Sequence, residues 1–150
     1  MFNKFIASIL PYFPKNLIWI FSRSYISGKS VEDAMRVSKE FNNENILVTL
    51  DVLGEFIKDL GEAEKNKQEY LELIDITFKN GINGNFSVKP TSFGLLIDKE
   101  ICYLHLREIV AKASSYNRFI RIDMEDSPCT SLEIELFRRL KTEFPANVGL

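Results

Sequence analysis

Three short runs with the alternation of a β-strand are each followed by charged side chains, and this recurrence constrains the fold more than any other feature. The clearest run is Phe119 to Ser127, FIRIDMEDS, in which apolar and polar residues alternate and three carboxylates follow closely. Earlier in the chain, NILVTLDVLGE ends in Asp51 and Glu55, and NFSVKP leads to Lys89. Carboxylates at the end of a buried strand are costly unless a site needs them. We therefore expect these strand ends to form a site.

Helical patterns separate the strand-like runs, so the chain alternates regularly between the two types of element. We expect strands over 46–50, 85–89, 119–124 and 146–150, and helices over 31–41, 53–80, 100–116 and 130–144. Gly61 suggests a break in the second helix, and the Thr130–Glu133 stretch is typical of a capping box that opens the last helix. This order predicts parallel strands joined by right-handed helical crossovers.

The two sides of each predicted strand differ in polarity, which favours a barrel over an open sheet. The polar side carries Thr49 and Asp51, Ser87 and Lys89, and Arg121 and Asp123. A sheet covered by helices on both faces would be apolar on both. We therefore predict an α/β fold of parallel βα units that forms the first half of a TIM-like (β/α)8 barrel, preceded by N-terminal helices. Such a barrel needs eight strands, so we expect the chain to be the front half of a longer protein. A small open α/β domain is the alternative.

Composition narrows the function classes and divides the chain in two. The chain has 150 residues, 45% of them hydrophobic, and a net charge of −2, which indicates no nucleic-acid partner. Residues 1–24 form a basic, apolar segment that we interpret as a helical docking segment or a contact with a membrane surface, and residues 25–150 form the barrel part. The apolar run at 17–21 is too short to span a bilayer. Two distant cysteines, Cys102 and Cys129, indicate reduced thiols in a cytoplasmic protein.

Several charged residues allow a structural reading beside a functional one. Asp51 could cap the next helix, Glu55 could favour that helix's N-terminus, and Lys89 could extend into solvent. We expect structural roles for Asp126 (loop or cap), His105 (packing or surface), Tyr70 and Phe78 (core). With one histidine, the chain offers no zinc cluster.

Three of the carboxylates also allow a second type of chemistry. An oxygen-ligated divalent metal held by Asp51, Asp123 and Glu125 would make the chain part of an unrelated metal-dependent barrel enzyme. General acid–base work is the other use of paired carboxylates.

The motifs LDVLGE, SVKPTSFGL and RIDMEDS, in this order and spacing, resemble the proline dehydrogenase family, and the resemblance covers about residues 25–150. The family includes monofunctional enzymes and the equivalent domain of bifunctional proline-utilisation flavoproteins. The resemblance implies a distorted TIM barrel with noncovalently bound FAD. It also implies oxidation of L-proline to Δ1-pyrroline-5-carboxylate, with hydride transfer to the flavin and passage of electrons to a membrane quinone.

The resemblance also implies roles for individual residues. Lys89 matches the lysine that pairs with the substrate carboxylate, and Asp123 matches the active-site aspartate beside proline and flavin. Met124 occupies the position whose backbone contacts FAD. Supporting charges would be Asp51, Glu55 and Glu125, with no metal.

The sequence departs from the family in ways that bear on activity. Many members have SVKLSALG where this chain has SVKPTSFG, which keeps the lysine and alters the loop. The family's flavin-contacting glutamine and arginine, and its paired arginines on the last helix, would lie beyond Leu150. We therefore expect this chain alone neither to hold FAD tightly nor to oxidise proline. The alternative is a non-catalytic half-barrel that acts as an interaction module and pairs through its exposed strand edge with another chain or its own copy.

Overall fold

The computed structural model describes residue 27 and residues 30–150, so the helical segment expected over residues 1–24 lies outside the described residues. The chain forms two units, residues 1–37 and 38–150. Helix α3, Val31–Asn43, begins in the first unit and ends in the second. Ser30 precedes it, and its hydroxyl accepts the backbone N–H of Asp33 at 3.3 Å.

Residues 38–150 contain a four-stranded parallel sheet in the order β1-β2-β3-β4. Its strands are β1 Val48–Leu50, β2 Gly84–Val88, β3 Ile120–Ile122 and β4 Val148–Gly149. Each strand lies within or close to its predicted run, and the parallel arrangement is confirmed. In the register, Phe86 is paired with Ile120, and Ile120 is paired with Val148.

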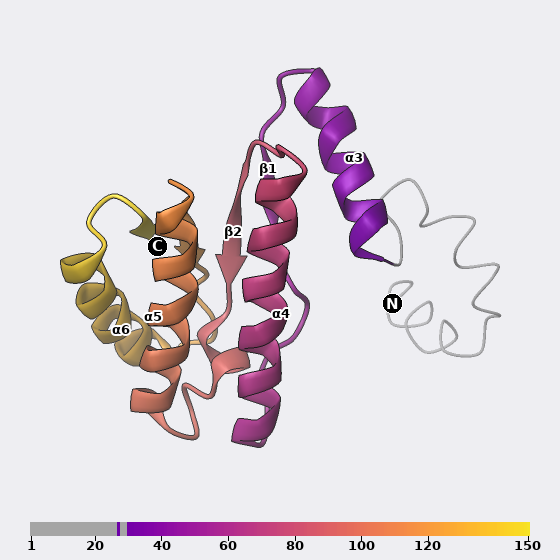
Figure 1. The fold of residues 1–150 in the computed structure, drawn as a ribbon. Helices are drawn as coiled ribbons and strands as arrows, with labels where there is room; N and C mark the ends of the chain where they lie inside the picture. Colours follow the sequence, from indigo (N-terminus) through magenta and orange to yellow (C-terminus); the bar gives the residue numbers. More distant parts are fainter. Residues whose placement is uncertain (1–26, 28–29) are drawn as a thin grey trace, which may run out of the picture. The chain divides into compact units, whose positions relative to one another are not determined.

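Three long helices pack side by side on one face of this sheet (Figure 1). They are α4 Leu60–Lys79, α5 Lys99–Ser115 and α6 Thr130–Glu143, and a short 3-10 helix, η2 Pro90–Phe93, precedes α5. A strand order that follows the chain without reversal, with every crossover helix on the same side, is the winding of a barrel wall. A doubly wound sheet would reverse its order and carry helices on both faces. The predicted α/β half-barrel is confirmed.

The core lies between the sheet and its helices, on the side that the alternation of residues predicts to be apolar. Phe86, Val88, Ile120 and Ile122 project from the strands and are each at most 1% exposed. The helices meet them with apolar side chains of comparable burial: Ile74, Leu106, Ile109 and Leu140. Full burial of one such side chain stabilises the fold by about 1.5–3 kcal/mol. Thr49 and Arg121, on the predicted polar side, are exposed.

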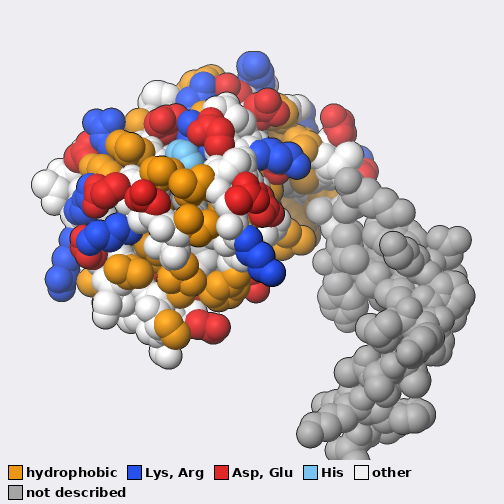
Figure 2. Space-filling view, turned by 90° about the horizontal axis from the view of Figure 1, so that it is seen from below, with side chains coloured by type: hydrophobic (Ala, Val, Ile, Leu, Met, Phe, Trp, Pro, Cys, Tyr) orange, Lys and Arg blue, Asp and Glu red, His pale blue; other side chains and the backbone are white. Residues whose placement is uncertain are grey.

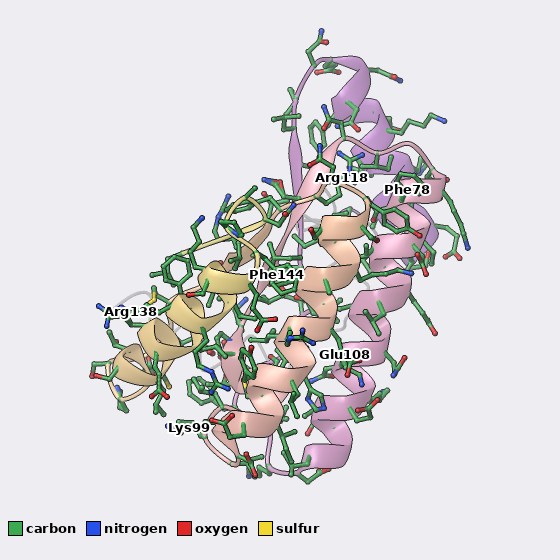
Figure 3. The ribbon with its side chains drawn as sticks, turned by 60° about the vertical axis from the view of Figure 1, so that its left-hand side comes forward. Phe78, Lys99, Glu108, Arg118, Arg138 and Phe144 are labelled. Atoms are coloured by element: carbon green, nitrogen blue, oxygen red, sulfur yellow. The ribbon has the colours of Figure 1, made fainter. Side chains whose placement is uncertain are left out.

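Ion pairs join neighbouring helices. Lys67 of α4 lies 3.1 Å from Glu108 of α5, and Lys99 of α5 lies 3.0 Å from Glu135 of α6. Figure 3 shows Glu108 in the seam between α4 and α5 and Lys99 at the start of α5, beside α6. These contacts lie on the side of the sheet that the helices cover. The opposite, polar side therefore remains available for a site.

Two sequence predictions about helix starts were wrong. The helix expected from residue 53 begins at Leu60, because Asp59 caps it by accepting the N–H of Glu62 at 3.0 Å. Residues 51–59 form a loop instead, and Gly61 is the second residue of an unbroken helix. The expected capping box at Thr130 does not form, since Cys129 occupies the cap position without a side-chain hydrogen bond. Within the described part of the chain, no helix is both long and apolar enough to cross a membrane.

Candidate active site

Lys89 lies between two carboxylates at the ends of three neighbouring strands. Its Nζ is 2.8 Å from Asp51 Oδ2 and 3.7 Å from Asp123 Oδ2. The carboxylates directly follow β1 and β3, and the lysine directly follows β2, which lies between them. Pro90 keeps Lys89 extended, with φ −102° and ψ 115°. The structure thus brings together the two acids and the ammonium group that we expected to meet.

The Lys89 ammonium group is the part of this cluster that can bind an anionic group of a ligand. The hydrogen bond to Asp51 raises the pKa of Lys89, against the smaller opposing effect of burial, so the lysine is charged at neutral pH. Its side chain is 25% exposed, and an ammonium group has three donors, of which Asp51 accepts one. The free donors can therefore form charge-assisted hydrogen bonds with a ligand carboxylate.

Tyr70 of α4 contacts this cluster, although we expected it to have only a core role. Its ring is 1% exposed and packs edge-on against Phe93 at 5.4 Å between centroids, which agrees with that role. Its hydroxyl, however, lies 2.6 Å from both Asp51 Oδ1 and the carbonyl of Ser87, and it accepts the N–H of Val52 at 3.1 Å. The hydroxyl of a buried tyrosine needs hydrogen-bond partners. This general requirement is the only sequence signal that could have indicated the contact with Asp51.

Ser87 holds the second carboxylate. Ser87 is 6% exposed. Its side chain lies on the polar side of β2, and its hydroxyl donates a hydrogen bond to Asp123 Oδ1. The other oxygen of Asp123 faces Lys89. Tyr70 and Ser87 therefore fix Asp51 and Asp123 on either side of the ammonium group.

The remaining predicted site residues do not join the ammonium group directly. Glu125 turns to η2 and accepts two hydrogen bonds from Thr91, at 2.9 Å from the N–H and 2.5 Å from the hydroxyl. Glu55 is exposed in the loop after β1 and influences the pKa of Lys89 only as a distant charge. Met124 is 45% exposed next to Asp123. Asp126 lies in the loop between β3 and α6, as expected, and its carbonyl accepts the N–H of Cys129 at 2.8 Å.

Glu133 is a second residue whose position the sequence did not reveal. It is fully buried, and its Oε1 accepts the backbone N–H of Glu125 at 3.0 Å. Its Oε2 has no hydrogen-bond partner among the described residues. Burial raises the pKa of this carboxyl group. Glu133 thereby ties the loop after β3 to the first turn of α6.

The metal alternative loses its ligand set in this geometry. Asp51 and Asp123 share a lysine, and Glu125 binds Thr91. Across residues 30–150, no group of three His, Cys, Asp or Glu side chains is arranged to hold a metal ion.

The cysteines and the histidine have packing roles. Cys102 and Cys129 are buried free thiols whose pKa values are raised by burial, so both are poor nucleophiles. His105 is 7% exposed in α5, with Nε2 3.3 Å from Glu64 Oε2. Its packing role is confirmed.

The loops that follow the strands carry exposed hydrophobic side chains. Figure 2 views the molecule from the end at which β2 terminates, and it shows hydrophobic side chains gathered among acidic and basic ones. The loops that follow the strands contribute Leu53, Phe56, Leu96, Ile97 and Met124, each more than 40% exposed. Apolar rims around a few placed polar groups are typical of binding sites for small molecules.

Comparisons with known proteins identify the family of this chain. A model of the family described as proline dehydrogenase matches residues 34–148. "Proline dehydrogenase 1" of Bacillus subtilis (strain 168) is 31% identical over 123 residues, which cover 82% of this chain and 41% of that protein. "Proline dehydrogenase" of Deinococcus radiodurans is 31% identical over 132 residues, which cover 86% of this chain and 43% of that protein.

A solved structure shows the same fold. Proline utilization A (PutA) from Bdellovibrio bacteriovorus, inactivated by N-propargylglycine, superposes with a TM-score of 0.70 at 24% identity, over 79% of this chain and 15% of that one. The chain therefore spans about two fifths of the length of its curated relatives and a smaller share of the PutA chain. Since the family model spans most of residues 25–150 and relatives reach 31% identity, this chain belongs to the proline dehydrogenase family.

Proposed function

We propose that this chain forms the substrate-binding part of a proline dehydrogenase, which oxidises L-proline to Δ1-pyrroline-5-carboxylate with FAD as hydride acceptor and a quinone as the final electron acceptor. The observation that carries the proposal is the Lys89 ammonium group, set 2.8 Å from Asp51 and 3.7 Å from Asp123 at three adjacent strand ends. Family membership supports it, since both curated relatives described above are named as proline dehydrogenases.

The charges of the cluster match those of the substrate. Proline at neutral pH carries a carboxylate and a secondary ammonium group. Lys89 has free donors for the carboxylate, and Asp123 presents an oxygen to the same space for the ring nitrogen. The reaction removes a hydride from the ring carbon next to that nitrogen, so holding the ring in one orientation is the main task of these residues.

The residues present fit part of a flavin site. Met124 is 45% exposed and lies beyond the last ladder pair, Val88 with Ile122, so its backbone groups are not used by the pairing of β2 with β3. Arg121, exposed on the polar side of β3, suits the phosphates of a dinucleotide. When bound, the flavin would supply the hydride acceptor that no side chain can provide.

We further propose a cytoplasmic protein that contacts the inner face of the membrane through residues 1–24, because a quinone acceptor resides in the membrane and this segment is basic and apolar. We also propose that the chain alone is inactive, because the family resemblance implies that other flavin-binding positions lie outside these residues.

One observation favours the alternative of an interaction module. β1 and β4 are the edge strands of the described sheet, and an unpaired edge is a template for another strand. The occupant would be a second copy or another chain. Sedimentation of the purified chain distinguishes self-pairing from a monomer.

A hybrid enzyme tests the proposed function. In it, this chain replaces the matching segment of the Bacillus subtilis relative, and L-proline-dependent reduction of an artificial electron acceptor is measured with added FAD. We expect activity, and we expect its loss in the Lys89→Met hybrid. A hybrid that folds and retains flavin yet shows no dependence on L-proline would refute the assignment.

A further inference from the structure

Tyr70 has a hydrogen-bonding pattern that goes beyond what packing requires. Three polar groups from two strand ends surround its oxygen: the Asp51 carboxylate and the Ser87 carbonyl, each at 2.6 Å, and the Val52 N–H at 3.1 Å. A phenol has one proton, so it donates to one of the two acceptors at a time. The bond to the carboxylate is charge-assisted and is the stronger of the two.

This oxygen links the end of β1 to the end of β2. Val52 and Asp51 follow β1, while Ser87 lies within β2. The same contact fixes Oδ1 of Asp51, which leaves Oδ2 for Lys89 at 2.8 Å. Because residues 51–59 form a loop rather than a helix, no helical hydrogen bonds would otherwise hold Asp51 in place.

We propose that Tyr70 is a positioning residue: its hydroxyl holds Asp51 against Lys89, so that the ammonium group is presented at the strand ends for the carboxylate of the substrate. The identity of that substrate as L-proline rests on the proposed function, whereas the positioning itself does not. The phenol stays protonated in this role, because burial and the neighbouring Asp51 both raise the pKa of Tyr70. Tyr70 touches no reacting atom and acts through Asp51.

NMR of the ammonium groups of the full 150-residue chain tests this positioning. A hydrogen-bonded lysine ammonium exchanges its protons with water slowly. In Tyr70→Phe, which keeps the buried ring, we expect exchange at Lys89 to accelerate by about three- to tenfold, as the loss of one hydrogen bond implies. The matched control is Tyr103→Phe, which removes a hydroxyl that binds Glu143 on the outer surface and should leave Lys89 unchanged.

A double-mutant cycle separates positioning from a general structural effect. Asp51→Asn should accelerate exchange at Lys89 by itself, and adding Tyr70→Phe to it should change nothing further, because Tyr70 acts through Asp51. Equal effects of Tyr70→Phe in both backgrounds would overturn the proposal. So would unchanged exchange in the single variant, or failure of that variant to fold, which would assign the hydroxyl to the fold as a whole.

A ligand titration of the same chains completes the test. We expect L-proline to shift the Lys89 signal, pyrrolidine to leave it unchanged because it lacks a carboxylate, and Tyr70→Phe to weaken the L-proline effect. If L-proline left the Lys89 signal of the wild-type chain unchanged, this result would count against the proposed function. The proton-exchange measurement would still decide the role of Tyr70.

Discussion

Replacing Lys89 by methionine should remove the recognition of a substrate carboxylate while preserving the fold. Methionine has nearly the length of the lysine side chain and no charge. The lysine is 25% exposed, and ion pairs at such exposure contribute about 0–1 kcal/mol to stability. We therefore expect the free energy of unfolding of Lys89→Met to stay within about 1 kcal/mol of wild type.

The effect on ligand binding should be much larger. A hydrogen bond to a charged group contributes about 1.5–3 kcal/mol, which corresponds to a change in affinity of about 10- to 150-fold. The lysine is also the cation that faces Asp51 and Asp123. Without it, an incoming carboxylate meets two uncompensated acids, so the loss should lie toward the upper end of this range.

Titration of the full chain with L-proline and with pyrrolidine, followed by NMR, measures this loss. Wild type should prefer L-proline over pyrrolidine, and Lys89→Met should lose this preference because two uncompensated carboxylates then face the ligand. The matched control is Lys79→Met, which removes an exposed lysine in the last turn of α4. An unchanged preference for L-proline in Lys89→Met would remove Lys89 from the site and refute the charge argument.

Three further predictions concern the loop after β3, the sheet and the isolated chain. Because burial raises the pKa of Glu133 above its ordinary 4.5, its contribution to stability is present below that value and is lost as pH rises through the raised pKa. Glu133→Gln mimics the protonated group, so its stability relative to wild type in urea unfolding should increase from pH 4 to pH 8; a constant difference would contradict this reasoning. Gly84→Ala would place a Cβ 2.7 Å from the carbonyl oxygen of Val48, which should destabilise the chain by about 1–3 kcal/mol, whereas Gly54→Ala, with 3.6 Å to its nearest neighbour, should change stability little. Purified residues 1–150 should be colourless after dialysis against FAD-free buffer and should not oxidise L-proline; a yellow, active preparation would show that the flavin site is more complete than we infer.

Local sequence patterns predicted the layers of the fold but not the boundaries of every element. Alternation in FIRIDMEDS placed Ile120 and Ile122 on the buried side and Arg121 on the open side, since side chains on a strand alternate between its faces. The start of α4 was misplaced because residues 53–59 contain no proline and we did not read Gly54 as a break. Asp59 sets the boundary by accepting the N–H of Glu62. Other acidic residues nearby, such as Asp51 and Glu55, could also lie at a helix start, so the sequence alone does not single out Asp59.

The sequence by itself determined that Asp51, Lys89 and Asp123 would share one end of the sheet, because parallel strands in chain order bring their carboxyl ends to the same edge. Only the tertiary structure decided which groups hold them. Tyr70 lies 19 residues from Asp51, and Ser87 lies 36 residues from Asp123, so these hydrogen bonds depend on how α4 and β3 pack against β2. Periodicity reports which face of an element is buried, whereas a hydrogen bond between elements is fixed by their relative height and rotation, which no local pattern encodes.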